Sequence, residues 1–360
     1  MNDTKGLFEP NNHSVWQISY QPVDSGVRTS IRQSLLENFS LSDVLVEQIE
    51  QVGEAEQASN NFKVQVVLPN GEEITWLVRK HILLSNESEA VFLEKTLSFL
   101  KEKKIPVPTI IPLKTGQLHF ALGGAIWQVF AFEGGNHYRG EKKELAAIAL
   151  GLAHLHQALE SFPYQEELSA KRPALTPFSE EALKVILKQA QKNEDDIDQS
   201  FIEHTDVLYR ATSFLGEFTA VSVSRQILHG DMHPHNTLFN DGALRAILDF
   251  DMMQEGERVR EVAFAAHRFA RQYAVFAQSG PEGAREGFGV FVEVYDKVNA
   301  LSNDEHHMLS YYLVEELLRR ITTDFSRYYF EGITRYATQK ELLKKVMLLQ
   351  EAMWLSHHAG

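Results

Sequence analysis

The most informative stretch of this 360-residue sequence is His229-Gly230-Asp231-Met232-His233-Pro234-His235-Asn236, and a second polar motif, Asp249-Phe250-Asp251, follows it. Two short apolar runs lie between the motifs and flank Asn240-Asp241-Gly242, a strong turn signal. This pattern predicts a β-hairpin whose open end brings Asn236 close to Asp249. Asp231 lies on the same loop, so we expect two carboxylates and an amide oxygen to line one pocket.

An oxygen-lined pocket of this kind suits Mg²⁺, which takes few ligands from protein and the rest from water and phosphate. Phosphoryl transfer also needs one carboxylate that orients the attacking hydroxyl and accepts its proton. Asp231 precedes the other two residues on the loop, so we assign it as the base and Asn236 and Asp249 as the metal ligands. Each residue alone is more typical of a turn or a strand end, and it is the combined spacing that favours function.

The loop resembles that of the aminoglycoside phosphotransferase superfamily, whose motif is His-Gly-Asp-x-His-Pro-x-Asn and whose metal-binding strand ends in Ile-Asp-Phe or a similar triplet. His229–Asn236 and Ile247-Leu248-Asp249-Phe250 match these motifs. A weaker likeness covers most of the chain, with one departure at Glu261, where the family commonly has aspartate. The resemblance implies a two-lobed, protein-kinase-like fold, a nucleotide donor (ATP or GTP), Mg²⁺, and transfer of the γ-phosphate to a hydroxyl of a small molecule. By position it gives Asp231, Asn236 and Asp249 the same roles.

The resemblance also points to two positions that face the acceptor. Asp251 stands where protein kinases have glycine, as is usual in these small-molecule enzymes. His235 occupies a variable position of the loop, where a solvated histidine is the alternative. We therefore name His235 and Asp251 as candidate substrate contacts.

The segments before residue 132 predict a β-rich lobe. The clearest signal is Pro69-Asn70-Gly71-Glu72, which lies between two alternating apolar segments and is typical of a β-hairpin. In chain order, the expected elements are a polar helical extension within residues 28–58, strands over 62–68 and 74–78, a helix over about 86–103, and a strand pair over 117–122 and 125–132.

After Glu133-Gly134-Gly135 the pattern changes to helices. The expected elements are helices over 141–160, 179–192 and about 203–222, a strand-rich island over 225–250, a helix over 259–278, and a helix from the capping box Ser302-Asn303-Asp304-Glu305 to about 325. The sequence thus predicts an α+β fold with an N-terminal nucleotide-binding lobe over 1–132 and a C-terminal catalytic and substrate-binding lobe over 133–360.

The resemblance requires a loop that covers the nucleotide phosphates. No Walker-type motif and no glycine-rich triplet is present. The loop before residue 62 is Ala58-Ser59-Asn60-Asn61, whose polar side chains can donate hydrogen bonds. Ser59 and Asn61 are therefore the candidates for contact with the phosphates, and an ordinary turn is the alternative.

A basic residue on the next strand and a helix glutamate that pairs with it complete the expected nucleotide site. Arg79 and Lys80 both follow an apolar pair, and strand alternation sends only one of them inward. Relatives have their basic residue directly after such a pair, which favours Arg79. Glu94 resembles the pairing glutamate, with Glu89 as the second choice.

Composition excludes several classes of function. The net charge is −14, from 35 basic and 49 acidic residues, so we expect no nucleic-acid partner, which would need a basic surface. The absence of cysteine excludes disulfides, zinc–thiolate sites and cysteine nucleophiles. Neither a signal peptide nor an apolar run of roughly 20 residues is evident, so we expect a cytoplasmic protein without a membrane partner. The oligomeric state stays open.

Two other functions compete with phosphotransfer. A metal-dependent hydrolase could use the alternating polar residues His229, Asp231, His233 and His235. That interpretation leaves Pro234 and Asn236 unexplained, and the hydrolase element Gly135-Asn136-His137 would have to follow the loop rather than precede it. A kinase-like binding protein without activity is the second alternative, although such a protein has no physical need for all three polar loop residues. The identity of the acceptor stays open, and the acidic bias of the helices after residue 259 allows a cationic one.

Overall fold

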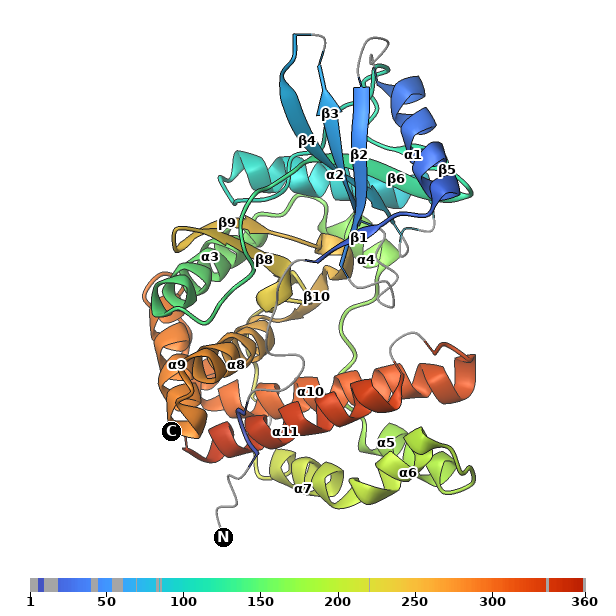
Figure 1. The fold of residues 1–360 in the computed structure, drawn as a ribbon. Helices are drawn as coiled ribbons and strands as arrows, with labels where there is room; N and C mark the ends of the chain where they lie inside the picture. The colour runs from blue at the N-terminus through green and yellow to red at the C-terminus, as the bar shows by residue number, and fades with distance from the viewer. Residues whose placement is uncertain are drawn as a thin grey trace.

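The computed structural model describes residues 6–9, 19–39, 45–53, 61–68, 70–81, 84, 86–219, 221–334 and 337–358. Figure 1 shows a lobe of strands with two helices above a larger helical body. Two long helices, α10 (Asn303–Glu331) and α11 (Gln339–His358), run side by side across that body. The predicted α+β class, with a β-rich first lobe and a helical second lobe, is confirmed.

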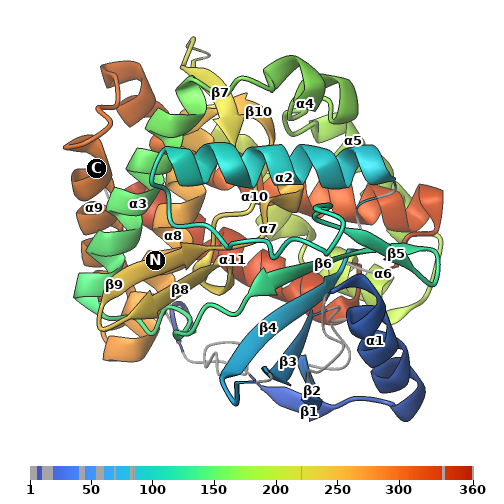
Figure 2. The same cartoon turned by 90° about the horizontal axis from the view of Figure 1, so that it is seen from above.

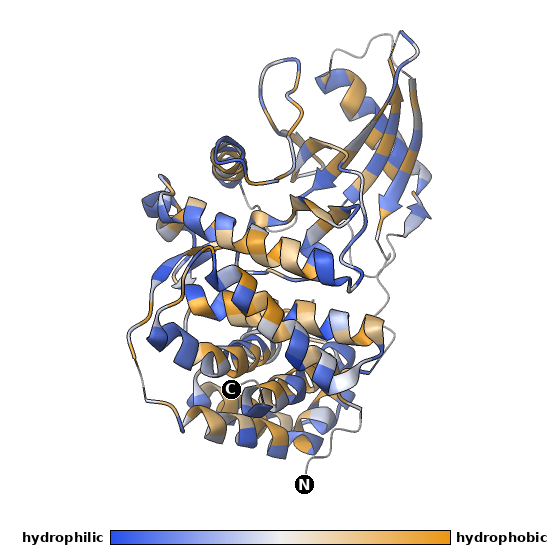
Figure 3. Cartoon of the chain, turned by 90° about the vertical axis from the view of Figure 1, so that its left-hand side faces the viewer, coloured by the Kyte–Doolittle hydropathy of each residue, from blue (hydrophilic) through white to orange (hydrophobic). Residues whose placement is uncertain are grey.

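The smaller lobe is built on a six-stranded antiparallel sheet with the order β1-β2-β3-β4-β6-β5. Its strands are β1 (Tyr20–Pro22), β2 (Leu45–Val52), β3 (Asn61–Val67), β4 (Glu73–Lys80), β5 (Phe120–Leu122) and β6 (Ala125–Ala131). Alternate residues of β3 are buried, and the strands in Figure 3 are banded with apolar and polar residues. The predicted Asn-Gly hairpin is confirmed, because β3 pairs with β4 and Gly71 adopts a left-handed φ of 82° at the turn.

One helix covers each face of this sheet (Figure 2). Helix α1 (Ser25–Asn38) packs in a core cluster with Val129 of β6. The next residue, Phe130, points to the other face and packs in the cluster that contains the apolar side of α2 (Glu87–Glu102). The predicted helix over about 86–103 is therefore confirmed, and it lies between the sheet and the helical body.

The prediction of helix over residues 28–58 is wrong in its second part. Helix α1 ends at Asn38, and β2 occupies Leu45–Val52, while residues 40–44 and 54–58 lie outside the described part of the chain. The register of β2 against β3 shifts between Val46 and Gln48. This bulge places the buried Val46 and Ile49 three residues apart, a spacing that imitates one face of a helix.

The helical body contains the remaining predicted helices, which are α3 (Lys142–Glu160), α5 (Glu180–Ala190), α7 (Thr205–Leu215), α8 (Arg258–Ala277) and α10. It also contains α4 (Gln165–Lys171), α6 (Asp196–Glu203), α9 (Gly280–Asp296) and α11, which the sequence did not predict. The capping box at Ser302 and Glu305 is confirmed, and α10 continues beyond the expected end near 325. The predicted helix over 203–222 is shorter, because α7 ends at Leu215.

The strand-rich island lies within this body as two antiparallel pairs. The predicted hairpin is confirmed as β8 (Thr237–Asn240) and β9 (Ala243–Ile247). The strand β7 (Arg225–Leu228) pairs instead with β10 (Gln254–Glu257), which the sequence did not predict. Both polar motifs therefore lie between the two pairs, one on each crossing segment.

The predicted division at residue 132 falls between the end of β6 at Ala131 and the start of α3 at Lys142. That boundary stays a prediction. None of the described helices combines the length and the apolar character that crossing a bilayer requires.

Candidate active site

The loop between β7 and β8 is fixed first by its glycine. Gly230 has a φ of 83°, and a Cβ at this position would lie 2.1 Å from the backbone oxygen of Met252. Both the left-handed backbone and the close approach to the neighbouring chain segment require glycine. The His-Gly-Asp motif thus presses the loop against the segment that carries Asp249.

Glu261, in the first turn of α8, holds the start of the loop. Its carboxylate accepts the backbone N–H of His229 at 3.0 Å and that of Gly230 at 2.6 Å, and it lies 2.8 Å from His156 Nε2. Burial by itself would raise the pKa of Glu261, but His156 and the loop N–H groups hold it below its ordinary value. The departure from aspartate therefore has a structural role, since an ionised side chain bridges the helix and the loop.

Asp231 is held as a carboxylate. Arg320 Nη1 donates to Asp231 Oδ1 at 2.9 Å, and His233 Nε2 lies 3.2 Å from Asp231 Oδ2. Burial would raise the pKa of Asp231, but His233 and Arg320 outweigh it and hold the pKa well below its usual range. The group assigned as base is therefore ionised and fixed in orientation.

Arg320 contacts the candidate site, and the sequence did not indicate it. Its Nη2 also donates to the backbone oxygen of Gly230 at 2.9 Å, and its Nε donates to Glu316 at 2.6 Å. The guanidinium lies 4.2 Å from the ring centroid of Phe264, which places it in cation–π contact. Every side of this guanidinium therefore has a partner, and only a tertiary contact between α10 and the loop reveals it.

Asn236 and Asp249 lie together at the open end of the hairpin, as predicted. Leu248 N donates to the backbone oxygen of Asn236 at 2.8 Å, so the residue before Asp249 is bonded directly to Asn236. The Asn236 amide nitrogen donates to the backbone oxygen of Asp231 at 2.9 Å, which leaves its Oδ1 available to a cation. An amide oxygen and a carboxylate are hard ligands that fit Mg²⁺.

Arg79 reaches across from the sheet to the segment that carries Asp249 and Asp251. Its Nη2 lies 2.8 Å from Asp249 Oδ1 and 2.8 Å from Asp251 Oδ2. Burial would raise the pKa of Asp251, but Arg79 and then His81 lower it to about 2. The two carboxylates in turn raise the pKa of Arg79 against the effect of burial. Of the two basic candidates, Arg79 is the one that faces the site.

The other residues predicted to contact the nucleotide have their contacts within the sheet lobe or lie outside the described residues. Glu94 lies 2.8 Å from His119 Nδ1 and accepts from Gln128 at 3.2 Å, so its partners are within its own lobe. Lys80 is opposite Trp127 in the register of β4 and β6. Asn61 is opposite Arg79 at the start of β3, whereas Ser59 lies outside the described residues.

Asp251 belongs to a buried polar chain between the lobes. Its side chain is 4 % exposed and lies 3.7 Å from His81 Nδ1, whose ring is bonded to Gln128 at 2.8 Å. Gln128 in turn donates to Glu94. The structure thus places Asp251 against the sheet, where it anchors Arg79, rather than at an open surface for an acceptor.

The histidines of the loop are used mainly to shape it. His229 Nε2 lies 2.8 Å from the backbone oxygen of Leu248, and His233 Nδ1 accepts the backbone N–H of His235 at 3.2 Å. Burial, followed by His233, holds the pKa of His235 well below its ordinary value. Within the described ranges, no three His, Asp or Glu side chains are grouped so that they could hold a metal ion. These contacts do not support the hydrolase alternative.

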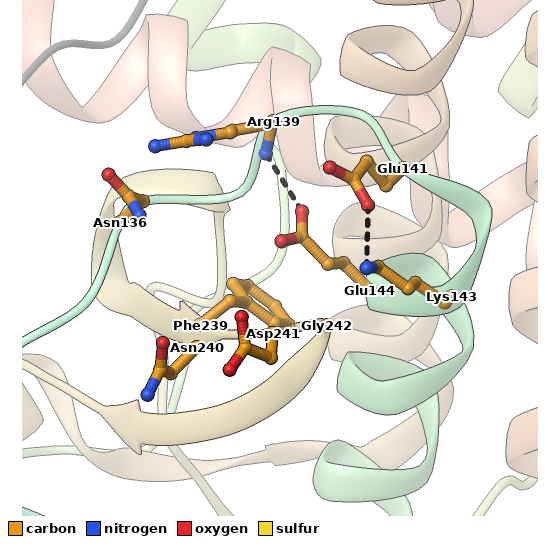
Figure 4. Close-up of a pocket in the computed structure, with 9 residues that line it drawn as sticks. All are labelled: Asn136, Arg139, Glu141, Lys143, Glu144, Phe239, Asn240, Asp241 and Gly242. Carbon is orange, nitrogen blue, oxygen red and sulfur yellow. Dashed lines mark hydrogen bonds and ion pairs between the residues drawn. The ribbon is translucent and has the colours of Figure 1, made fainter.

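A small cavity lies at the other end of the hairpin (Figure 4). Its lining residues come from the β8–β9 turn and the segment leading into α3, and they are Asn136, Arg139, Glu141, Lys143, Glu144, Phe239, Asn240, Asp241 and Gly242. Glu144 accepts the backbone N–H of Arg139 at 3.1 Å, so the polar groups here pair with one another. The turn separates this cavity from the open end that carries Asn236 and Asp249.

Solved structures share this architecture at low sequence identity. A spectinomycin phosphotransferase in complex with ADP and spectinomycin is 15% identical, with 94% of this chain and 99% of that chain covered and a TM-score of 0.61. An amicoumacin kinase in complex with AMP-PNP, Ca²⁺ and its ligand is 14% identical, with 90% and 93% covered and a TM-score of 0.59. An aminoglycoside phosphotransferase from Alicyclobacillus acidocaldarius is 16% identical, with 94% and 98% covered and a TM-score of 0.55. These likenesses confirm the kinase-like fold.

The sequence itself matches one family. No curated protein sequence matches the chain significantly. The profile of the phosphotransferase enzyme family, however, matches residues 54–294, which include the sheet from β3 onward, the catalytic loop and α8. This match confirms both the resemblance to aminoglycoside phosphotransferases and the prediction of a phosphotransferase. The chain belongs to the phosphotransferase enzyme family.

Proposed function

We propose that the protein transfers the γ-phosphate of ATP or GTP to a hydroxyl group of a small molecule, in a reaction that depends on Mg²⁺. The observation that carries this proposal is the ionised Asp231, which Arg320 orients beside the oxygen pair of Asn236 and Asp249. Solved structures with the same fold hold ADP, AMP-PNP or GDP, which supports a nucleotide donor.

Asp231 acts on the acceptor in this proposal. Its carboxylate accepts a hydrogen bond from the acceptor hydroxyl and orients the oxygen for attack on the γ-phosphate. The proton passes to Asp231 as the new P–O bond forms and the bond to the leaving diphosphate breaks. A low pKa suits this role, because the carboxylate is ionised when the hydroxyl arrives and takes the proton only as the oxygen becomes acidic.

Asn236, Asp249 and Arg79 act on the nucleotide. Asn236 and Asp249 would hold Mg²⁺, which supplies charge neutralisation for the phosphates. Arg79 shares its guanidinium between two carboxylates, of which Asp249 is 39 % exposed and Asp251 is 4 % exposed. Arg79 can therefore keep Asp251 as a partner while its other side turns to a phosphate oxygen.

Two substitutions test the assignment, because they separate chemistry from binding. Asp231→Asn removes the proton acceptor and keeps the shape, so we expect turnover to fall by about 10²- to 10⁴-fold with nucleotide affinity nearly unchanged. Asp249→Ala removes a metal ligand, so we expect weaker binding of Mg-ATP itself. The measurements are ADP release with a panel of hydroxyl compounds and calorimetric titration of ATP with and without Mg²⁺.

The matched control is Asp241→Asn in the hairpin turn, which is exposed and should leave both measurements unchanged. Near-normal turnover in Asp231→Asn would show that another group is the base. If Mg-ATP binds to the wild type through Asp249 but no acceptor in the panel is phosphorylated, a binding protein without transferase activity would be supported instead.

A further inference from the structure

Three basic side chains from three helices gather beside the catalytic loop. The short 3-10 helix that ends the loop, Pro234–Asn236, packs against α8. Arg268 comes from α8, Arg320 from α10 and Lys344 from α11. Arg320 contacts Asp231 directly and stacks on Phe264, which is one helical turn before Arg268 on α8.

Lys344 lies within reach of the charge of Arg268. One turn further along α8, Arg271 donates to Glu351 of α11 at 2.8 Å and lies 3.7 Å from the sulfur of Met347. Lys344 has a carboxylate partner on its own helix, since its Nζ lies 3.5 Å from Glu341 Oε1. Burial, with Arg268 contributing, lowers the pKa of Lys344.

Arg268 differs from the other arginines of α8 in its partners. Arg258 pairs with Glu305, Arg260 with Glu315, and Arg271 with Glu351. Arg268 has no hydrogen-bond or ion-pair partner among the residues that the structure describes, and it is half-buried. Burial, and then the charge of Arg271, lowers its pKa to about 10. An unpaired, half-buried cation costs folding free energy and calls for a compensating role.

The same ion pairs neutralise most of the buried acidic residues of these helices. Their acidic bias allows a cationic acceptor when the sequence alone is considered. In the structure, the carboxylates of Glu305, Glu315, Glu316 and Glu351 are buried against arginines. Among the described residues beside the loop, Arg268 is therefore the basic group without a carboxylate at ion-pair distance.

We propose that Arg268, the basic side chain beside the loop that has no carboxylate at ion-pair distance among the described residues, binds an anionic group of the acceptor. The acceptor is then a hydroxyl compound that carries a carboxylate or a phosphate, and not a cationic amino alcohol. This inference rests on the proposed function, because it names the acceptor of that reaction. Arg320 contacts both Asp231 and Phe264, and Phe264 is one helical turn from Arg268 on α8, so a short compound can place its hydroxyl at Asp231 and its anion at Arg268.

The first experiment measures anion binding without any turnover. Sulfate is titrated into the full-length protein in the absence of nucleotide and followed by calorimetry. We expect Arg268→Gln to weaken sulfate binding by roughly tenfold or more, because it removes a charged hydrogen-bond donor. Arg210→Gln on α7 is the matched control, since Arg210 is exposed and should leave sulfate affinity unchanged. Arg79→Gln should also leave sulfate affinity unchanged, which would show that the sulfate does not bind at the proposed nucleotide phosphate site.

Thermal melting of Arg268→Met checks that the residue is not simply structural. Removal of an unpaired cation should raise the melting temperature, whereas a loss of stability would show that Arg268 holds the fold together and would contradict the proposal. Equal sulfate affinity in Arg268→Gln and the wild type would overturn it as well.

A matched set of acceptors then connects the site to the reaction. Glycerate, glycerol and 3-amino-1,2-propanediol differ mainly in the charge at one end. We expect the lowest KM for glycerate, and we expect Arg268→Gln to raise that KM while the KM for glycerol stays the same. Turnover that favours the amine would overturn the anion site and leave the phosphotransferase assignment standing. If sulfate binding depends on Arg268 but no alcohol is phosphorylated, the anion site stands and the phosphotransferase assignment is overturned.

Discussion

Two arginine–carboxylate contacts meet at the centre of the molecule, and they are built differently. Arg320 and Asp231 both belong to the helical body, and Arg320 is also bonded to Gly230 and Glu316. Arg79 comes from the sheet, and it contacts Asp249 and Asp251 across the boundary between the lobes. The first contact lies within one lobe, whereas the second joins the two lobes at the place where the proposed function puts the nucleotide.

This difference indicates a division of labour. A carboxylate that orients a hydroxyl needs a fixed direction, and three separate partners give Arg320 only one position. A carboxylate that binds a metal must give up its protein partner. Asp249 can do so, because Arg79 remains paired with Asp251 when it leaves Asp249. In the proposed function, the contact at Asp231 is thus permanent, and the contact at Asp249 is replaceable.

Loss of the permanent contact should have the largest effect. Arg320→Met removes the groups that orient Asp231 and hold the Gly230 carbonyl, so we expect turnover to fall by about 10²-fold through misplacement of the base. Nucleotide affinity should change little. Steady-state kinetics and ATP titration measure the two quantities.

Arg319→Met is the control for this prediction. Arg319 donates to the same Glu316 at 2.7 Å but makes no hydrogen bond to the described residues of the loop, so its loss removes a charge from the network without freeing Asp231. If both variants lose turnover equally, the role of Arg320 lies in the charge network and not in orientation.

A smaller effect should follow from breaking the replaceable contact. Arg79→Gln should weaken Mg-ATP binding by roughly 10- to 100-fold, the loss expected for a hydrogen bond to a charged group. Lys80→Gln should leave the affinity within a few-fold, because Lys80 is the neighbouring residue on the strand and points to the other face. Equilibrium titration compares them, and an equal loss in both variants would assign the phosphates to Lys80 as well.

The smallest effect concerns stability. Glu261→Gln keeps one acceptor oxygen for the two loop N–H groups, so we expect a loss of about 1–3 kcal/mol in the free energy of unfolding. Because the folded pKa of Glu261 is below the ordinary 4.5, its ionised form contributes stability above that pH, and the contribution disappears as the pH falls below it. Denaturant unfolding at several pH values should therefore show the wild type and the variant converging in acid.

Glu293→Gln provides the comparison, since Glu293 is exposed and pairs only with Lys297 along the surface of α9. Its effect should stay within about 0.5 kcal/mol at every pH. A gap for Glu261→Gln that stays constant in acid would mean that its charge contributes nothing to the loop.

Local patterns predicted most of the fold and the core of the site. The β8–β9 hairpin and the pairing of Asn236 with Asp249 follow from a turn signal and two short strands, all within about twenty residues. The strand β2 escaped prediction because its bulge gives Val46 and Ile49 a helical spacing. Helix α10 was predicted from its cap, but nothing in its sequence marks Arg320 as the partner of a residue 89 positions earlier.

The sequence also could not predict which acidic residues pair with which arginines. In the sequence, the acidic residues of α10 and α11 indicate a negative surface. In the structure, arginines of α8 neutralise Glu315 and Glu351. Arg268 looks like its neighbours in the sequence, and only the tertiary arrangement shows that no described carboxylate lies at ion-pair distance from it, although the charges of Glu351 and Asp231 reach it. The departure at Glu261, by contrast, was visible in the sequence, and its role needed the structure.

The contact of Arg79 with Asp249 and Asp251 also affects the rate at which a nucleotide can bind. While it is closed, a nucleotide must displace a guanidinium that is hydrogen-bonded to the opposite lobe, so association includes an opening step and should be slower than the 10⁵–10⁷ M⁻¹s⁻¹ that is typical of unhindered docking. Salt screens exposed charges more than buried ones, and Asp249 is the exposed end of the bridge. Moderate salt should therefore loosen the entrance to the cleft before it affects the orientation of Asp231.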